Sequence, residues 1–191
     1  ATHVVSHAWS GCRSLLYLNF GNDVLSIGSQ AFQNCSELAI VSIGGSVITV
    51  GAEAFRDCSS LTSVVLGSSL DYIGTDVFTD CHALTDVTVP SPLPRSIVDV
   101  FDCSILTSVT FSEPSTSIDD EAMRNCPSVV AVYMFDNVTS IGEQAFALCP
   151  SLSSVKMSNQ IRYIGAGAFL GCESIIGLFL SDTVDSIGEG A

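Results

Sequence analysis

Eight cysteines are the residues of this 191-residue chain whose number and spacing first suggest chemistry. An even number of cysteines is typical of a disulfide framework, and cysteine thiolates also bind zinc. A strict period with one cysteine per repeat favours a third role, in which each thiol is a small apolar side chain in one buried column. We therefore predict free thiols, no metal site and no cofactor, although the expected distance between neighbouring repeats does not forbid a disulfide. The column consists of Cys12, Cys35, Cys58, Cys81, Cys103, Cys126, Cys149 and Cys172, whose intervals are all 23 residues except for one of 22.

The other side chains that carry chemistry do not form a recognisable active site. His3, His7 and His82 lie in no pattern typical of a nucleophile's base or of a metal-ligand set. The serines include no G-x-S-x-G nucleophile elbow. The densest acidic cluster, Asp119 to Glu121, lacks the alternating oxygen ligands of a calcium loop. The sequence therefore predicts that the protein is not an enzyme and that its carboxylates form a solvated face.

Two sequons for N-linked glycosylation occur, at Asn34 and at Asn137. Asn137 is the better candidate, because it follows an expected strand in a turn whereas Asn34 adjoins a cysteine that we expect to be buried. Glycosylation at Asn137 is thus a prediction for a secreted form of the chain.

The overall charge limits the classes of partner that the chain can bind. Six Lys and Arg against 20 Asp and Glu give a formal charge of −14, which opposes nucleic acid and anionic membrane surfaces. No apolar run approaches the roughly 18 residues that a membrane helix requires, so we expect no membrane insertion. Neither observation fixes the compartment.

The cysteines belong to a repeat that must position every other side chain. Each cysteine closes an arc with the pattern I-G-x-x-A-F-x-x-C, as in Ile27 to Cys35 and Ile141 to Cys149. Apolar residues follow the cysteine at +3, +6 and +8, and the last two are spaced as on a short strand with one buried face. Gly, Pro, Asn and Asp after that strand supply turn chemistry. A unit of this length is too short for helical repeats of about 33 residues and suits a leucine-rich repeat.

The predicted fold is therefore a leucine-rich repeat solenoid of about eight coils over residues 1–191. Each coil contributes one short parallel strand to a continuous sheet, with turns and short helical arcs on the other side. Both termini fall inside a repeat and no capping segment is visible, so we expect the chain to be a section of a longer repeat array.

The unit I-G-x-x-A-F-x-x-C-x-x-L followed by V-x-V resembles the BspA-like leucine-rich repeat family over essentially the whole chain. The resemblance implies a surface or secreted protein of bacteria or protists associated with adhesion to host or matrix proteins. It implies no catalytic residues.

The fourth repeat, from Cys81 to Cys103, departs from the pattern. Pro90, Pro92 and Pro94 replace an ordinary turn, and Phe101 stands two residues instead of three before the cysteine. In the next arc, Asp119 occupies the glycine position. Either loops here tolerate the irregularity, or the solenoid bends.

The outward side chains of the strands, at +5 and +7 from each cysteine, form the candidate interaction face. Aromatic residues contribute disproportionately to interfaces, so the face should bind through its tyrosines and phenylalanine. The leading hypothesis is a noncatalytic recognition or adhesion segment, on the cell surface or secreted, that binds protein or glycan. A self-assembling filament or coat and an intracellular (cytoplasmic) scaffold are the alternatives. The candidate residues are Tyr17, Asn19, Val65, Asp86, Thr88, Thr110, Tyr133, Lys156 and Phe179.

Overall fold

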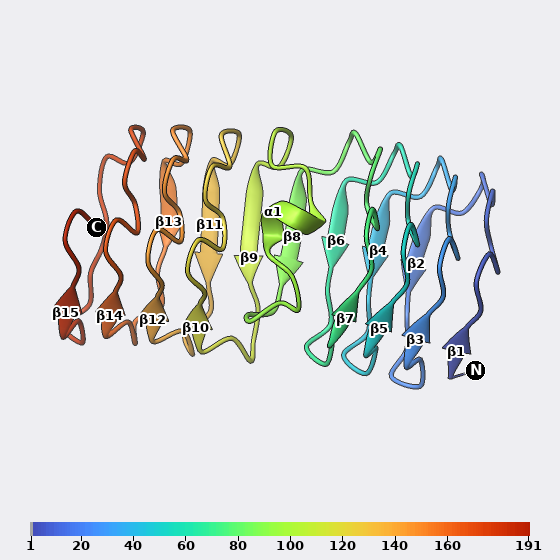
Figure 1. The fold of residues 1–191 in the computed structure, drawn as a ribbon, viewed down its shortest axis with the longest axis horizontal. Helices are drawn as coiled ribbons and strands as arrows, with labels where there is room; N and C mark the ends of the chain where they lie inside the picture. The colour runs from blue at the N-terminus through green and yellow to red at the C-terminus, as the bar shows by residue number, and fades with distance from the viewer. Residues whose placement is uncertain (1) are drawn as a thin grey trace.

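A computed structural model describes residues 2–191 as a stack of coils with the two chain ends at opposite ends of the stack (Figure 1). The apolar residues at +6 and +8 form parallel strands that pair in register into one seven-stranded sheet of order β13-β11-β9-β8-β6-β4-β2. Val41, Val64 and Val87 are the buried centres of three of these strands. The strands are β2 (Tyr17–Asn19), β4 (Ile40–Ser42), β6 (Ser63–Val65), β8 (Asp86–Val89), β9 (Ser108–Phe111), β11 (Ala131–Met134) and β13 (Ser154–Lys156).

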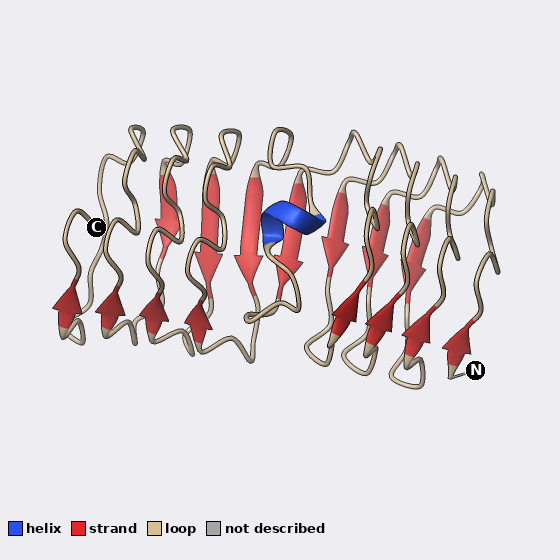
Figure 2. Ribbon diagram, in the orientation of Figure 1, coloured by secondary structure: helices blue, strands red, loops and turns tan. Residues whose placement is uncertain are grey.

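Each regular coil contains a second strand, so the prediction of one strand per coil was wrong in number. The isoleucine or valine of the I-G pair ends a two-residue strand that pairs with its counterparts, and these strands form two separate four-stranded sheets (Figure 2). The first sheet contains β1 (His3–Val4), β3 (Ser26–Ile27), β5 (Thr49–Val50) and β7 (Tyr72–Ile73). The second contains β10 (Ser117–Ile118), β12 (Ser140–Ile141), β14 (Tyr163–Ile164) and β15 (Ser186–Ile187).

The arcs between a short strand and the cysteine consist of successive turns instead of the predicted short helices. Two positions in each regular arc have positive φ, the residue two before the aromatic and the residue before the cysteine, as at Gln30 and Asn34. Asn and Asp tolerate this conformation, whereas Leu148, at φ 59°, is an unusual occupant. Because a left-handed residue recurs every four positions, a continuous right-handed helix cannot form. In the described part of the chain, the one helix is α1 (Ile97–Val100).

The glycine after each short strand permits the close approach of consecutive coils. A Cβ at Gly51 would lie 2.8 Å from the carbonyl carbon of Gly28 and closer still to the amide nitrogen of Ser29. Gly74 and Gly165 lie against the preceding coil in the same way. The glycine column therefore reflects packing between backbones, and only a residue without Cβ fits there.

The core contains a ladder of stacked aromatic rings, one from each arc except that of Met123. Phe55 is fully buried, and its ring centroid lies 5.4 Å from that of Phe32 and 5.6 Å from that of Phe78 with nearly parallel planes. The ladder begins at Trp9, ends its first run at Phe101, and resumes with Phe146 and Phe169 after Met123 takes the aromatic position. Offset stacking of this kind adds to the stabilisation from burial alone.

The short fourth repeat interrupts the stack on its arc side only. Strands β8 and β9 still pair over four residues, so the long sheet continues through the irregularity. On the opposite side, α1 stands where a short strand would join β7 to β10, and the two short sheets are separated at this point (Figure 2). Asp119 can replace glycine because the preceding coil has this altered path. The single missing residue therefore reorganises one side of the coil and leaves the other unchanged.

Candidate functional site

The outward positions of the long sheet form two rows of side chains. Strand register aligns Asn19, Ser42, Val65, Thr88, Thr110, Tyr133 and Lys156 in one row. The parallel row contains Tyr17, Ile40, Ser63, Asp86, Ser108, Ala131 and Ser154. Eight of the nine candidate interaction residues therefore lie on one sheet, at the positions that alternate with the buried column.

Phe179 is the exception among the candidate residues. The sequence predicts a strand over residues 177–180, but the structure has no strand between β14 and β15, and Phe179 is 93% exposed. The apolar residues at +6 and +8 there, Leu178 and Leu180, are not fully buried either. We therefore correct its placement, because Phe179 is not aligned with Tyr133 and Lys156 on the paired strands.

Phe135 is an exposed aromatic that the sequence analysis missed. It lies just after β11, two residues beyond Tyr133, and is about half exposed. The corresponding +9 positions of the other coils are occupied by Gly, Ser or Pro, as at Gly44 and Ser158. An aromatic in a column of small turn residues is the signal that could have identified it. Tyr133 and Phe135 thus place two exposed aromatic side chains on and just after β11.

The cysteines form the expected column but not with eight free thiols. Cys103 and Cys126 form a disulfide with their Cα atoms 4.8 Å apart, so the prediction is wrong for this pair. In five of the other coils the Sγ–H donates to the carbonyl oxygen of the aromatic position in the preceding coil, at 3.0–3.3 Å. Cys103 follows α1 in the short repeat and Cys126 ends the next arc, and as disulfide sulfurs they have no S–H to donate. The disulfide therefore joins the short repeat to the coil that follows it.

Burial contributes to raised pKa values at four of the free thiols, Cys35, Cys58, Cys149 and Cys172. The hydrogen bond with Cys35 lowers the pKa of Cys58, but the hydrogen bond with Cys81 and burial outweigh it and raise this pKa to about 12. Burial raises the pKa of Cys149 to about 11. The pKa of Cys172 is also raised by burial. Since the thiolate is the reactive form, the buried thiols should be inert near neutral pH.

Alkylation followed by mass spectrometry tests this arrangement. The chain, unfolded without reductant, should take up label at the six cysteines that are free, and all eight should be labelled after reduction. In the folded chain the half-buried Cys12 should react well before Cys58 and Cys149, because those two are buried and their thiolates are scarce. Eight labels without reductant would show that the disulfide does not form.

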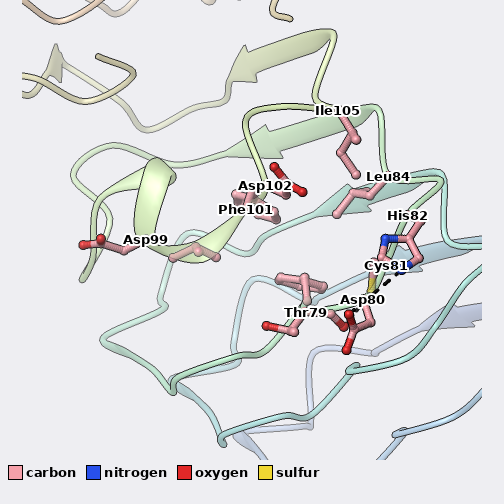
Figure 3. A pocket seen from close by; sticks show the side chains of 11 residues that line it. Thr79, Asp80, Cys81, His82, Leu84, Asp99, Phe101, Asp102 and Ile105 are labelled. Atoms are coloured by element: carbon pink, nitrogen blue, oxygen red, sulfur yellow. Dashed lines mark hydrogen bonds and ion pairs between the residues drawn. The ribbon is translucent and has the colours of Figure 1, made fainter. Parts of the chain in front are cut away.

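The short repeat opens a cavity of about 310 Å³ between the arc of residues 78–84 and the segment of residues 99–105 (Figure 3). Its inner part is apolar, with Phe78, Leu84, Phe101 and Ile105 in the lining. Asp80 and Asp102 supply carboxylates from the two facing segments. No other arc junction combines a shortened repeat with such a gap in the described chain, so the cavity is a product of the irregularity.

The charged groups at the cavity are partly paired. Asp80 lies 3.5 Å from Arg56 and 3.9 Å from His82. The Asp102 carboxylate accepts hydrogen bonds from the hydroxyl and amide of Ser104, at 2.6 and 2.9 Å, and these bonds and the nearby His82 lower its pKa. Arg56 is shared with Glu53 and Asp57 as well, so carboxylates remain in excess.

The remaining sequence candidates do not gather into a site. Residues 2–191 include no cluster of three or more His, Cys, Asp or Glu side chains arranged to hold a metal ion. Glu121 pairs with Arg124 at 2.6 Å, and Asp120 accepts the amide of Glu143 in the next coil at 2.7 Å. The acidic cluster is thus engaged in local structure.

Both sequon asparagines are exposed. Asn137 lies in the turn after β11, and Asn34 has an exposed side chain although Cys35 beside it is buried. Exposure therefore does not separate the two sequons, and glycosylation at Asn137 stays a prediction.

No described helix approaches the length needed to cross a bilayer. The parallel strands, the recurring turns and the aromatic ladder define a leucine-rich repeat solenoid with an uncovered sheet face. The model of the BspA type leucine rich repeat region matches residues 2–97 and 98–191, in six copies. This chain belongs to that family.

Several solved structures are similar to this chain. A leucine rich cell surface protein from Faecalibacterium prausnitzii is 25% identical, with a TM-score of 0.45, over 97% of this chain and 53% of that one. The leucine rich repeat protein of T. pallidum is 25% identical, with a TM-score of 0.47, over 92% of this chain and 72% of that one. This chain therefore spans about half the length of the first. Among curated proteins, none matches it.

Proposed function

We propose that the chain is a noncatalytic recognition segment of a surface or secreted protein, and that it binds protein or glycan through the outer face of the long sheet. The observation that carries the proposal is the in-register face of the seven strands, on which Tyr17, Ile40 and Tyr133 are exposed. Large apolar and aromatic side chains on an uncovered strand face are the usual anchors of an interface.

The composition of this face supports binding over chemistry. Between the aromatic ends the rows carry hydroxyl groups from Ser63, Thr88 and Thr110, which can donate and accept hydrogen bonds. Buried valines beneath them fix the strands, so the outer side chains are presented by a rigid support. Membership in the BspA-type family agrees with a role at the cell surface.

Substitution of Tyr133 by Ala tests the face. We expect binding to a panel of immobilised extracellular-matrix proteins or to a glycan array to weaken by about tenfold, since an exposed aromatic anchor carries a large share of the binding energy. Stability should change little, because the ring lies outside the core.

Tyr163→Ala is the matched control. Tyr163 is 45% exposed and Tyr133 41% exposed, but Tyr163 lies on β14 in the short sheet, away from the proposed face. Its substitution should leave binding unchanged. Equal losses from the two substitutions, or none from Tyr133→Ala, would contradict the proposal. Sedimentation as large polymers, with no binding to either panel, would favour self-assembly instead.

A further inference from the structure

The arc junction at the short repeat leaves backbone donors without partners. In regular junctions three amides of one arc donate to carbonyls of the next coil. Glu53, Phe55 and Asp57, for example, donate to Thr75, Val77 and Thr79, each at 3.0 Å. The same amides occur one coil later at Asp76, Phe78 and Asp80, and they have no hydrogen-bond acceptor within residues 2–191. The other described arc junctions between regular coils keep such bonds, so the loss follows from the missing residue.

Two of these three amides belong to residues in the wall of the cavity. Phe78 and Asp80 both line it, and in the regular junctions the equivalent amides point toward the next coil. Phe78 is only 5% exposed, and a buried amide without an acceptor is costly. The rings of Phe78 and Phe101 still stack at 5.1 Å, so the coils touch in the core while their backbones separate above it.

The surrounding charge selects the kind of acceptor that fits. Amide donors suit an oxygen ligand, but the carboxylates of Asp80 and Asp102 and the net charge of −14 oppose an anion. Peptide carbonyl oxygens accept hydrogen bonds without a negative charge. In the regular junctions the acceptors are carbonyls of alternate residues, and an extended peptide also presents the carbonyls of alternate residues along one edge.

We propose that this cavity is a docking site for an extended segment of a partner protein that carries an arginine. The segment's carbonyls accept from the amides of Phe78 and Asp80, as the next coil does elsewhere. The arginine enters the cavity, where its methylene groups contact Phe101 and Ile105 and its guanidinium pairs with Asp80 and Asp102. The site lies on the arc side of the solenoid and is separate from the outer face of the long sheet.

A titration with a defined peptide tests the proposal. Acetyl-Ser-Val-Arg-Val-Ser-amide is added to the ¹⁵N-labelled chain, in parallel with the same peptide carrying Leu or Glu in place of Arg. We expect the arginine peptide to shift the amide resonances of Phe78 and Asp80, and to bind about tenfold more tightly than the leucine peptide. No shift with the arginine peptide, or equal affinity for all three, would overturn the proposal.

A double substitution and a matched control distinguish binding at this cavity from general electrostatic attraction to an acidic chain. Asp80→Asn together with Asp102→Asn should weaken the arginine peptide by about tenfold or more. Asp57→Asn is the control, because Asp57 has the same left-handed conformation as Asp80 and also lies near Arg56, yet its amide is paired with Thr79. Asparagine has nearly the same shape as aspartate and tolerates the positive φ of positions 57 and 80, so each variant should fold. Equal weakening by the control would also overturn the proposal.

The Tyr133→Ala variant tests whether the cavity binds peptide independently of the outer face of the long sheet. Tyr133→Ala should leave the peptide titration unchanged, because Tyr133 is on β11 and outside the cavity. Loss of peptide binding in that variant would contradict a separate site.

Discussion

Substitution of Gly51 by Ala is expected to destabilise the solenoid by about 3 kcal/mol, the upper end of what overpacking usually costs. The added methyl group would overlap the backbone of Gly28 and Ser29 in the preceding coil. Backbone atoms held between paired strands cannot move aside as the end of a flexible side chain can. The coils would have to separate, which would weaken the β3–β5 pairing beside the glycine. Urea unfolding monitored by circular dichroism measures the effect.

Gly45→Ala is the control for this substitution. Gly45 lies in the turn after β4, where a Cβ would meet only the Ser68 hydroxyl oxygen at 3.8 Å. Its φ is not positive, so alanine should be tolerated with a change below about 0.5 kcal/mol. Similar stability of the two alanine variants would refute close backbone approach as the reason for the glycine column.

Phe55→Ala is expected to cost about 4 kcal/mol, as for other fully buried aromatics. Two contributions combine. The loss of the ring creates a cavity in the core. It also removes the stacking contacts of Phe55 with Phe32 and with Phe78. Because stability in a solenoid passes between nearest neighbours, the loss should be concentrated in the adjacent coils. Urea unfolding of the variant, compared with the parent chain, gives the magnitude.

Phe179→Ala supplies the comparison. The same ring is lost, but from a side chain that is 93% exposed, so stability should change by less than about 0.5 kcal/mol. If both variants lost the same stability, the aromatic ladder would not be a source of core energy.

The periodic features of the fold could be predicted because each has a strong side-chain signature. The +6 and +8 apolar pairs located the long strands, as at Val64 and Leu66, and the register followed from the constant 23-residue period. The outward rows then followed from strand alternation alone. Most of the candidate face is therefore where the sequence placed it.

The second set of strands and the turns of the arcs could not be predicted in the same way. A two-residue strand such as Thr49–Val50 is too short for an alternating pattern. The sequence analysis predicted turns and short helical arcs on this side of the coils. The left-handed residues exclude such helices, but Glu53 and Gln144 carry no signature of positive φ, since it is the coil-to-coil hydrogen bonds that hold them there.

The short repeat shows a different limit. The missing residue before Cys103 was visible in the sequence, but its consequences depend on three-dimensional neighbours. Three features occur at the short repeat: the disulfide with Cys126, the helix α1 and the unpaired amide of Phe78. All three lie on the arc side of the coil, while the long sheet on the other side continues unchanged. A one-dimensional pattern does not distinguish those sides.

Amide hydrogen exchange tests most directly the central claim, that the stack is continuous along the long sheet and open on its arc side at the short repeat. The amides of Glu53, Phe55 and Asp57 should be protected by their bonds to the next coil, and those of Val87 and Val109 by the long sheet. The amides of Asp76, Phe78 and Asp80 should exchange faster by at least about tenfold, because protection requires a hydrogen-bond acceptor. Equal protection of the two sets of arc amides would contradict the account.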